Sequence, residues 1–333
     1  MKKVLISIIV VLLVLTTVFA FACKKEAPKA AGEYTIVSPE GAPALALASF
    51  AKNSKISDTL TIKPSIVSAT LIKSEAIKSD FAIVPANMAS IIYNGGEEYC
   101  MVGTVTNGNM YIVSNEADSD FSLEKMKGHV LYSIGQGSIP AFILLNILQK
   151  AEIPFEVSET PVAGKVAITY CQDGKALMIK MKSASTKVYG NLPEPAVTTY
   201  VAAGGNRVAD LQELWKAATS SSITGFAQAV LIAKKSLCEN NKEVVTAVYN
   251  AMVKNETYVV EHAEEAREAL SGLAENIGFN APLLAQVVRN CNVKMYRASE
   301  NKDYIITSLE AAHKINPASV GGSVPAKDSG FYF

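Results

Sequence analysis

The sequence predicts an α/β protein of two domains, in which mostly parallel sheets are flanked by helices. The first observation is that short apolar segments alternate with helix-like segments, an order typical of parallel sheets. The second is that this alternation starts again near Ser122, after a strand-rich stretch. The third is the length of 333 residues, which suits two domains whose cores are large enough to fold without disulfides or metals.

The first 23 residues have the layout of a bacterial export signal. Lys2 and Lys3 provide a positive start, residues 4–22 carry no charge, and Cys23 follows. This Cys resembles the modified Cys of bacterial lipoproteins, which is diacylated and becomes the mature N-terminus, although Ala20 stands where those proteins usually have Leu. The apolar run is also nearly long enough to remain as a membrane anchor. Both alternatives place the rest of the chain outside the cytoplasm, attached to the cell membrane.

The charge balance argues against two classes of partner. Loss of a signal peptide, residues 1–22, removes Lys2 and Lys3 from the 31 basic residues and none of the 31 acidic residues, so the mature chain is almost neutral. Such a chain has neither the basic footprint of a nucleic-acid-binding protein nor a polybasic surface for anionic lipid. Residues 23–33 are rich in Ala, Lys and Glu and predict a flexible tether, so membrane attachment is expected from the lipid at Cys23.

The first cycle of elements begins close to the tether. Pro43 suits the first turn of a helix, because its missing N–H would have no partner there. Small polar residues follow two of the strands, at Ser38 and at Asn87. Strands are expected at 34–37, 59–67, 81–84 and 99–113, the last with a turn at 106–109, and helices at 44–51, 69–78 and 88–93.

The second cycle begins with a short helix over 122–128, which has Ser at its N-cap and Gly at its end. A strand at 129–134, the glycine-rich loop 135–138 and an apolar helix at 140–150 follow. The remaining elements are expected as strands at 166–170 and 187–188 and as helices at 207–218, 226–237, 242–262, 264–274, 281–288 and 301–315.

No pattern typical of catalysis or of a metal site is found. The three histidines form no H-E-x-x-H motif, no G-x-S-x-G is present, and Gly135-Gln136-Gly137 is only a fragment of a dinucleotide fingerprint. The other four cysteines lack the spacing of zinc ligands and are expected to be buried, reduced thiols. We therefore expect neither an enzyme nor a bound cofactor or metal. The three histidines are His129, His262 and His313, and the four cysteines are Cys100, Cys171, Cys238 and Cys291.

Binding is better supported than catalysis. Three strand-to-helix turns carry small polar residues directly before a helix, at 38–42, 85–87 and 133–138. In open parallel sheets, ligands bind at the carboxyl ends of strands, where helix N-termini present free N–H groups and partial positive charge. The alternative is that these residues only cap helices and form turns, which such a fold needs in any case.

Several motifs resemble periplasmic-type solute-binding lipoproteins of ABC importers. Gly41-Ala42-Pro43, after the first strand, looks like the opening of these proteins, and residues 123–132 resemble their entry into the second lobe. Residues 191–198 resemble the Glu-Pro turn of the branch that binds nitrate, sulfonates, taurine and thiamine-pathway pyrimidines. Residues 135–138 match the loop that commonly grips an anionic group there. One departure is the stretch 178–183, where that family often has an acidic G-x-x-D step.

The resemblance implies a two-lobed type II periplasmic-binding-protein fold, each lobe a mostly parallel sheet flanked by helices. Lobe 1 would combine residues 34–118 with 226–333, and lobe 2 would hold residues 119–225. Crossings near 114–119 and 222–225 would form the hinge. The resemblance further implies that a monomer captures a small organic molecule between its lobes and delivers it to the permease and ATPase subunits of an ABC importer.

The same resemblance and the three turns give the candidate ligand-binding residues. We expect backbone N–H groups at 41–42 and 137–138, several polar side chains and an aromatic wall to hold the ligand. The full set is Ser38, Gly41, Ala42, Asn87, Thr104, Asn107, Tyr132, Gln136, Gly137, Ser138, Tyr170 and Glu194.

The ligand and the wider role stay open at this point. No Arg precedes Arg207, so an earlier residue cannot provide a bidentate Arg clamp, which favours a neutral or weakly charged organic ligand. One alternative is an enzyme of the menaquinone or pyrimidine pathway on the same fold, although the export signal disfavours these cytoplasmic enzymes. Another is a ligand sensor or adhesin that does not transport.

Overall fold

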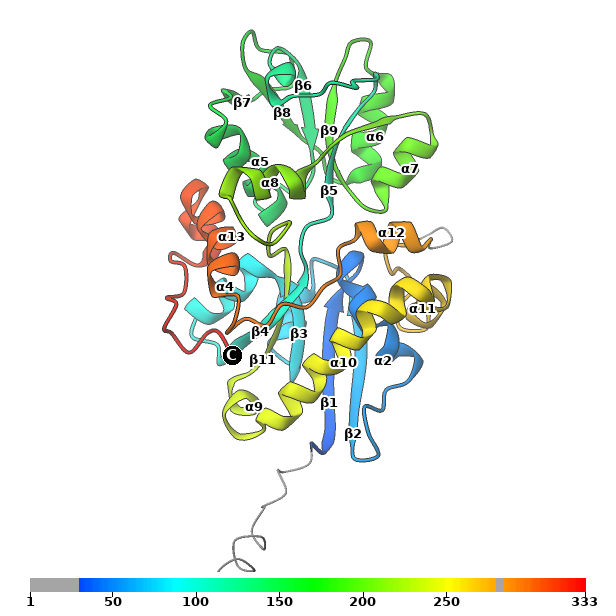
Figure 1. Ribbon diagram of the computed structural model, residues 1–333, viewed down its shortest axis with the longest axis vertical. Helices are drawn as coiled ribbons and strands as arrows, with labels where there is room; N and C mark the ends of the chain where they lie inside the picture. The colour runs from blue at the N-terminus through cyan, green and yellow to red at the C-terminus, as the bar shows by residue number, and fades with distance from the viewer. Residues whose placement is uncertain (1–29, 280–283) are drawn as a thin grey trace, which may run out of the picture.

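The computed structural model describes residues 30–279 and 284–333, which form two sheets, each flanked by helices (Figure 1). We call the five-stranded sheet with its helices lobe 1 and the six-stranded sheet with its helices lobe 2. The predicted signal peptide, Cys23 and residues 24–29 of the predicted tether lie outside the described residues. Within the described ranges, no helix is both long and apolar enough to cross a membrane.

The sheet of lobe 1 has the strand order β2-β1-β3-β11-β4. β1 pairs in parallel with β2 and β3, whereas β11 pairs antiparallel with β3 and β4 and therefore lies between them. Every residue of β4 is buried, as expected for a strand covered on both faces. The strands are β1 (Gly32–Pro39), β2 (Leu60–Val67), β3 (Phe81–Pro85), β4 (Tyr99–Thr106) and β11 (Ala229–Lys234).

The sheet of lobe 2 has the strand order β10-β5-β9-β6-β8-β7. β6 pairs in parallel with β8 and β9, and β7 with β8, whereas β5 pairs antiparallel with β9 and β10. The parallel strands thus end at one edge of the sheet, which faces lobe 1 (Figure 1). The strands are β5 (Met110–Ser114), β6 (Val130–Ser133), β7 (Phe155–Val157), β8 (Val166–Tyr170), β9 (Tyr189–Pro193) and β10 (Asn206–Asp210).

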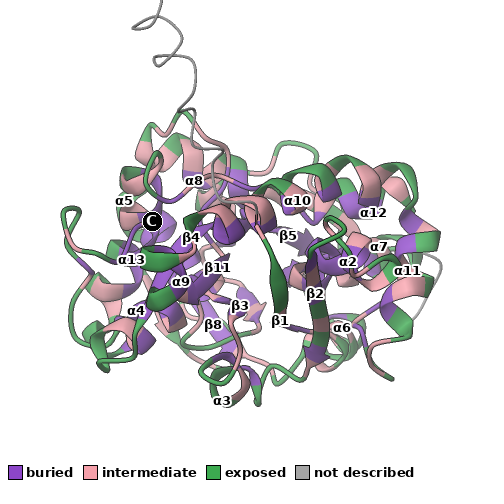
Figure 2. Cartoon of the chain, turned by 90° about the horizontal axis from the view of Figure 1, so that it is seen from below, coloured by how far each residue is buried: buried purple, intermediate pink, exposed green. Residues whose placement is uncertain are grey.

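The helices cover both faces of the two sheets. Figure 2 shows the buried residues concentrated in inner strands such as β3 and β11, with exposed residues on the surrounding helices and loops. The helices are η1 (Ala42–Leu47), α2 (Ala48–Lys52), α3 (Ile72–Ala76), α4 (Ala86–Asn94), η2 (Leu123–Met126), α5 (Ile139–Lys150), α6 (Gly174–Ser183), α7 (Ala196–Ala202), α8 (Leu211–Thr219), α9 (Lys235–Asn240), α10 (Lys242–Glu261), α11 (Ala263–Ser271), α12 (Ala285–Asn290), α13 (Lys302–Ile315) and η3 (Pro317–Val320).

The two lobes share a continuous apolar core around α5. This helix is apolar on almost every side, because Ile139 and residues 141–148 are all buried. α13 lies C-terminal to β11 and contacts α4 of lobe 1. It also packs on α5 of lobe 2 (Figure 1). The amide of Asn146 donates a hydrogen bond to the carbonyl oxygen of Ala311 at 2.8 Å, so a polar contact fixes this packing as well.

The chain crosses between the sheets at 107–109 and again between α8 and β11. A third segment, residues 292–298, runs beside β4 and makes backbone hydrogen bonds to it, including Thr104 N–H to Tyr296 O at 2.9 Å. Gly103 is required for this approach, because a Cβ there would lie 2.6 Å from the Tyr296 carbonyl oxygen. Three segments outside the regular helices and strands therefore meet in the crossing region.

The two-lobed α/β fold predicted from the sequence is confirmed, and several boundaries need correction. The first crossing comes earlier than the expected 114–119, because residues 110–114 pair with β9 and β10 in lobe 2. The expected helix at 226–237 is wrong, since β11 occupies residues 229–234 and α9 begins only at Lys235. The expected helix at 207–218 begins only at Leu211, after β10. Of the helix expected at 281–288, residues 281–283 lie outside the described residues.

Candidate functional site

A cleft of about 210 Å³ lies between the two lobes at the carboxyl ends of the strands. Lobe 1 contributes the ends of β1 and β3, and lobe 2 contributes the end of β9 and the loop between β6 and α5. Such an edge is where ligands bind in open α/β sheets. The lining residues are Pro39, Pro43, Pro85, Met110, Ile134, Gly135, Ser138, Ile139, Pro140, Pro193, Gln228 and Ala229.

The chemistry of this lining is apolar. Five of the described lining residues are proline and none of them is charged. Proline has no N–H, so each proline offers a ligand a hydrocarbon surface where another residue would offer a donor. Ser138 and Gln228 supply the polar side chains of the lining.

Gln228 connects the two lobes across the cleft. Its backbone N–H donates to the carbonyl oxygen of Thr106 at 3.0 Å, and its own carbonyl accepts from Ala86 N–H at 2.9 Å. Its side-chain Nε2 donates to Oδ1 of Asn109 at 3.0 Å, and Nδ2 of Asn109 donates to the carbonyl oxygen of Glu194 at 3.3 Å. These bonds fix the orientation of the Gln228 amide, and its buried Oε1 is left without a partner among the described residues.

The loop between β6 and α5 brings Ser138 to the cleft. Gly135 and Gly137 have φ angles of 68° and 81°, which side-chain-bearing residues rarely adopt, and Ser138 N–H donates to the Gly135 carbonyl oxygen at 2.8 Å. Gln136 and Gly137 are exposed and do not contribute to the cleft lining. Of the expected loop residues, only Ser138 lines the cleft in the described structure.

The expected residues of the first turn lie beside the cleft with their polar groups engaged. Gly41 N–H donates to the carbonyl oxygen of Ile277 at 2.9 Å, so it is not the free donor that the sequence suggested. The hydroxyl of Ser38 is fully buried and donates to the Pro39 carbonyl oxygen at 3.0 Å. Ala42 is buried at the start of η1, directly before the cleft residue Pro43.

Thr104 and Asn107 belong to the crossing between the lobes. Thr104 Oγ1 donates to the Lys294 carbonyl oxygen and accepts from Tyr296 N–H, at 3.1 Å each. Asn107 Nδ2 donates to the same carbonyl at 2.7 Å, and its Oδ1 accepts from the Tyr304 hydroxyl at 3.1 Å. These contacts use both side chains to hold the segment 292–298, and neither residue is part of the cleft lining.

The remaining expected residues are distributed around the cleft. Asn87 lies in the first turn of α4, and its Nδ2 donates to the Ser319 carbonyl oxygen at 3.1 Å. Tyr132 and Tyr170 are half-buried on β6 and β8 and lie outside the cleft lining. Lys180 Nζ lies 5.8 Å from the centre of the Tyr132 ring, a cation–π contact.

Glu194 is a buried carboxylate that joins the lobes. Only 3% of its surface is exposed, and its oxygens accept from Thr198 N–H at 3.2 Å and from the Thr198 hydroxyl at 3.0 Å, at the start of α7. Its Oε1 also accepts from Nδ2 of Asn290 at 2.9 Å, at the end of α12. The carboxylate thus stabilises the N-terminus of a lobe 2 helix and contacts the helix that precedes the segment 292–298.

Sequence reasoning missed most of the cleft because it searched for polar residues. Met110, Ile134 and Ile139 line the cleft but look like ordinary core residues in the sequence. The signal that could have found the site is the recurrence of proline where strands end and helices begin, as at Pro39, Pro85 and Pro193.

A larger hollow of about 520 Å³ lies at the crossing region, away from the carboxyl ends of the parallel strands. It is lined mainly by polar side chains from β5, α8 and the segment around α12, rather than by the ends of parallel strands. Its principal residues are Tyr111, Asp210, Gln212, Arg289, Asn290, Asn292, Lys294 and Tyr296. We take the smaller cleft as the candidate ligand site, because it joins strand ends of both sheets and the larger hollow does not.

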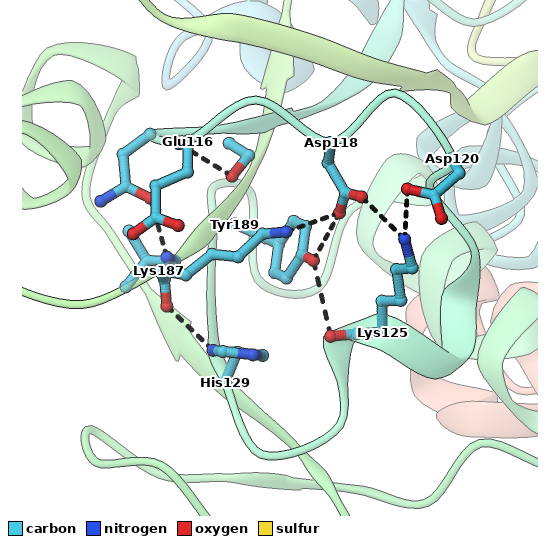
Figure 3. Close-up of polar contacts among 10 residues, drawn as sticks. Glu116, Asp118, Asp120, Lys125, His129, Lys187 and Tyr189 are labelled. Atoms are coloured by element: carbon cyan, nitrogen blue, oxygen red, sulfur yellow. Dashed lines mark hydrogen bonds and ion pairs between the residues drawn. The ribbon is translucent and has the colours of Figure 1, made fainter.

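A cluster of charged residues lies around Asp118, between β5 and η2 (Figure 3). The Asp118 side chain is 2% exposed and accepts from Lys187 Nζ at 2.8 Å, the Tyr189 hydroxyl at 2.9 Å and Lys125 Nζ at 3.2 Å. The hydrogen bond from Lys187 is the main cause that lowers the pKa of Asp118 to about 2. All of these partners belong to lobe 2, so the cluster fastens one loop to its own sheet.

The four cysteines among the described residues form no disulfide. Cys100, Cys238 and Cys291 are buried and Cys171 is half-buried, and all four are free. Among the residues that the structure describes, no group of three His, Cys, Asp or Glu side chains could hold a metal ion.

Comparison with known proteins shows likeness in structure. No protein-family model matches the chain, and no curated protein matches it. An ABC transporter structure from Parabacteroides distasonis has a TM-score of 0.70 and 20% identity, covering 90% of this chain and 98% of that one. The periplasmic aliphatic sulphonate-binding protein SsuA from Escherichia coli has a TM-score of 0.65 and 14% identity, covering 92% of both chains.

A third solved structure is similar over the same extent. The alkanesulfonate-binding protein SsuA from Xanthomonas axonopodis pv. citri, bound to MOPS, has a TM-score of 0.53 and 13% identity, covering 90% of this chain and 96% of that one. At these identities the likeness concerns the fold, and it extends over almost the whole of each chain. The protein therefore has the two-lobed type II fold of the periplasmic binding proteins.

Proposed function

We propose that the protein is an extracytoplasmic solute-binding lipoprotein, which captures a small organic molecule between its lobes and delivers it to an ABC importer. The observation that carries the proposal is the cleft at the junction of the lobes, where strand ends of both sheets meet. A site divided between two lobes can bind a ligand more tightly when the lobes approach each other, because only then does the ligand contact both walls.

The crossing region suits such a movement. Two of its connections, at 107–109 and between α8 and β11, are short segments outside helices and strands, and hinge motions are absorbed by a few residues of this kind. The contact between Glu194 and Asn290 joins the lobes beside the hinge and would favour the closed form. The closed form would then be the one that docks on the permease.

The N-terminal segment supplies the proposed location. Cys23 would carry the lipid, and residues 24–31 would connect it to β1, which begins at Gly32. A lipid-anchored receptor stays close to its permease and needs no membrane-spanning helix of its own. Metabolic labelling with a fatty-acid analogue tests this part of the proposal: the Cys23→Ser variant should lose the label that the wild type acquires.

The test of the binding function is native mass spectrometry on residues 24–333 after gentle purification, followed by a thermal-shift series with any recovered molecule. A co-purified small molecule whose addition raises the melting temperature with concentration would support the proposal. A protein that carries no small molecule, and whose melting temperature is unchanged by anions, sulfonates, pyrimidines and flavins, would contradict it. Loss of uptake of the recovered molecule in cells that lack the protein separates an importer from a sensor.

A further inference from the structure

Two buried thiols of lobe 1 lie side by side. Cys100 in β4 and Cys238 in α9 are 5% and 4% exposed, and both belong to the core between the sheet and the helices α9 and α10. Both are free thiols in the structure, and a hydrogen bond joins their side chains. The other two described cysteines lie elsewhere, because Cys171 follows β8 of lobe 2 and Cys291 follows α12.

The turn from β11 into α9 brings these two thiols together. Ala233 of β11 pairs with Cys100 of β4, and α9 begins two residues later, at Lys235. The Lys235 N–H donates to the Glu98 carbonyl oxygen at 2.8 Å, which holds the start of the helix against the start of β4. Cys238 comes three residues after Lys235 and therefore shares a side of the helix with it. The backbone thus keeps the Cys238 thiol beside the strand that carries Cys100.

The hydrogen bond makes one of the two thiols the better nucleophile. Cys238 donates to the sulfur of Cys100, and this bond lowers the pKa of Cys100 and raises that of Cys238 from the ordinary value of 9.0. The positive charge of Lys235 also lowers the pKa of Cys100. Because the thiolate is the species that attacks a disulfide, Cys100 is the thiol that reacts first.

We propose that Cys100 and Cys238 form an intramolecular disulfide in the exported protein. The inference goes beyond the binding function, and it rests on the proposed location outside the cytoplasm. Disulfides persist in oxidising compartments and are rare in the cytosol, where thiols are kept reduced. The bond forms during folding, before the core covers the two sulfur atoms.

The oxidant is a second disulfide, that of a small thiol compound or of a thiol oxidoreductase. The Cys100 thiolate attacks one sulfur of this disulfide, which breaks its S–S bond and releases the first thiolate. The Cys238 thiol then loses its proton and attacks the Cys100 sulfur of the mixed disulfide, which releases the second thiolate. The protein loses two electrons and two protons, and the oxidant takes them up as it becomes two thiols.

The position of the bond determines what it stabilises. Residues 101–237 include every strand of lobe 2, so the bond closes a long loop whose two ends lie in lobe 1. A disulfide stabilises a fold mainly by restricting the unfolded chain, and a longer loop gives the larger effect. Cys100 lies near the end of β4 that is remote from the crossing at 107–109, so the bond leaves the movement of the lobes free.

Peptide mapping of the full chain tests the bond directly. The protein is purified from membranes, unfolded in iodoacetamide and digested without a reducing agent. Mass spectrometry should recover peptides linked through Cys100 and Cys238, with Cys171 and Cys291 alkylated. A link from either partner to Cys171 or Cys291 would overturn the pairing.

The state of Cys23 separates this inference from the proposed location. Alkylated Cys100 and Cys238 in molecules that carry a lipid at Cys23 would overturn the bond and leave the location in place. Alkylation of the same two residues in a chain without lipid would overturn the location and, with it, the inference.

The melting temperature provides an independent test. Reduction of the wild type with a phosphine should lower its melting temperature by at least about 4 °C, because a long loop is released in the unfolded chain. Cys238→Ser has no bond to lose, so its melting temperature should be the same with and without the phosphine. Cys171→Ser is the matched control and should respond as the wild type does. Equal melting temperatures of the wild type before and after reduction would overturn the stabilising role of the bond.

Discussion

Gly225 packs against the carbonyl oxygen of Asn107 where the two connections between the lobes meet. A Cβ on Gly225 would lie 1.9 Å from that oxygen, which also accepts hydrogen bonds from Phe226 N–H at 3.3 Å and from Nδ2 of Asn292 at 2.8 Å. The φ angle of Gly225 is 99°, a conformation that other residues rarely adopt. The junction of these two connections therefore depends on a residue without a side chain.

Substitution of Gly225 by alanine should be strongly destabilising. The added Cβ meets a backbone atom that cannot move without breaking the crossing, so Gly225→Ala should lower the free energy of unfolding by more than about 3 kcal/mol. Gly204→Ala is the matched control, because its φ angle is 92° and a Cβ there meets nothing within 4 Å. Urea unfolding should show a loss of only about 1 kcal/mol for the control. Similar losses in both variants would contradict the close approach to Asn107.

The Asp118 cluster predicts a specific dependence of stability on pH. Folding lowers the pKa of this carboxyl from 3.8 to about 2, chiefly through the hydrogen bond from Lys187. The ionised group therefore stabilises the folded state above about pH 4, by roughly 2 kcal/mol, and this contribution is lost as the pH falls towards 2. At pH 7, Asp118→Asn should be less stable than wild type by that amount.

The pH series gives the decisive comparison for this variant. The difference in unfolding free energy between wild type and Asp118→Asn should shrink as the pH is lowered from 4 to 2, because wild-type Asp118 then becomes protonated. Asp58→Asn, at an exposed position of lobe 1, should change stability by less than about 0.5 kcal/mol throughout. A difference that stays constant over this range would show that Asp118 does not act through its charge.

A large side chain at position 138 should block the cleft. Ser138 lines the cleft at the N-cap of α5, where its side chain makes no capping hydrogen bond, so its loss costs little stability. We expect Ser138→Trp to lower the affinity for the molecule that co-purifies with the wild type more than tenfold, so that the variant is purified without it. Ser183→Trp, on the exposed end of α6, should bind as wild type. Full occupancy of Ser138→Trp in native mass spectra would place the site elsewhere.

The contact between Glu194 and Asn290 should influence the position of the lobes. Asn290→Leu removes a charge-assisted hydrogen bond of about 1.5–3 kcal/mol, while the bonds of Glu194 to Thr198 remain. We expect a larger radius of gyration in X-ray scattering of the ligand-free protein and weaker binding of its ligand. Gln149→Leu, at an exposed position of α5, is the control. An unchanged radius in Asn290→Leu would mean that this contact does not hold the lobes together.

The parts of the fold that the sequence predicted are those where local signals agree with packing. Pro43 and the alanine-rich run after it marked the start of η1, and the apolar segment 140–150 gave α5 almost to the residue. The prediction of a helix at 226–237 was wrong because the apolar residues of this segment suit a buried strand as well as a helix. β11 is a strand only because β3 and β4 leave a place for it, which is information from distant parts of the chain.

The candidate site shows the same division. Three of the expected residues belong to the turns that form the cleft: Ser138 lines it, Ser38 precedes the lining residue Pro39, and Asn87 follows Pro85 in the first turn of α4. The sequence could not show that Asn107 is used by Lys294 and Tyr304, because those partners are far away in the sequence. The sequence analysis considered Pro43 only as the start of a helix, although it is one of five prolines that line the cleft.

The place of β11 in the sheet has a consequence for how the chain acquires its structure. β3 and β4 each pair with β11, so the sheet of lobe 1 cannot be completed before residues 229–234 are available. All strands of lobe 2 precede residues 229–234 in the chain, so its sheet can assemble while the sheet of lobe 1 is still incomplete. During synthesis, the N-terminal strands must therefore remain soluble with open edges, and the lobe that begins the sequence is the last to fold.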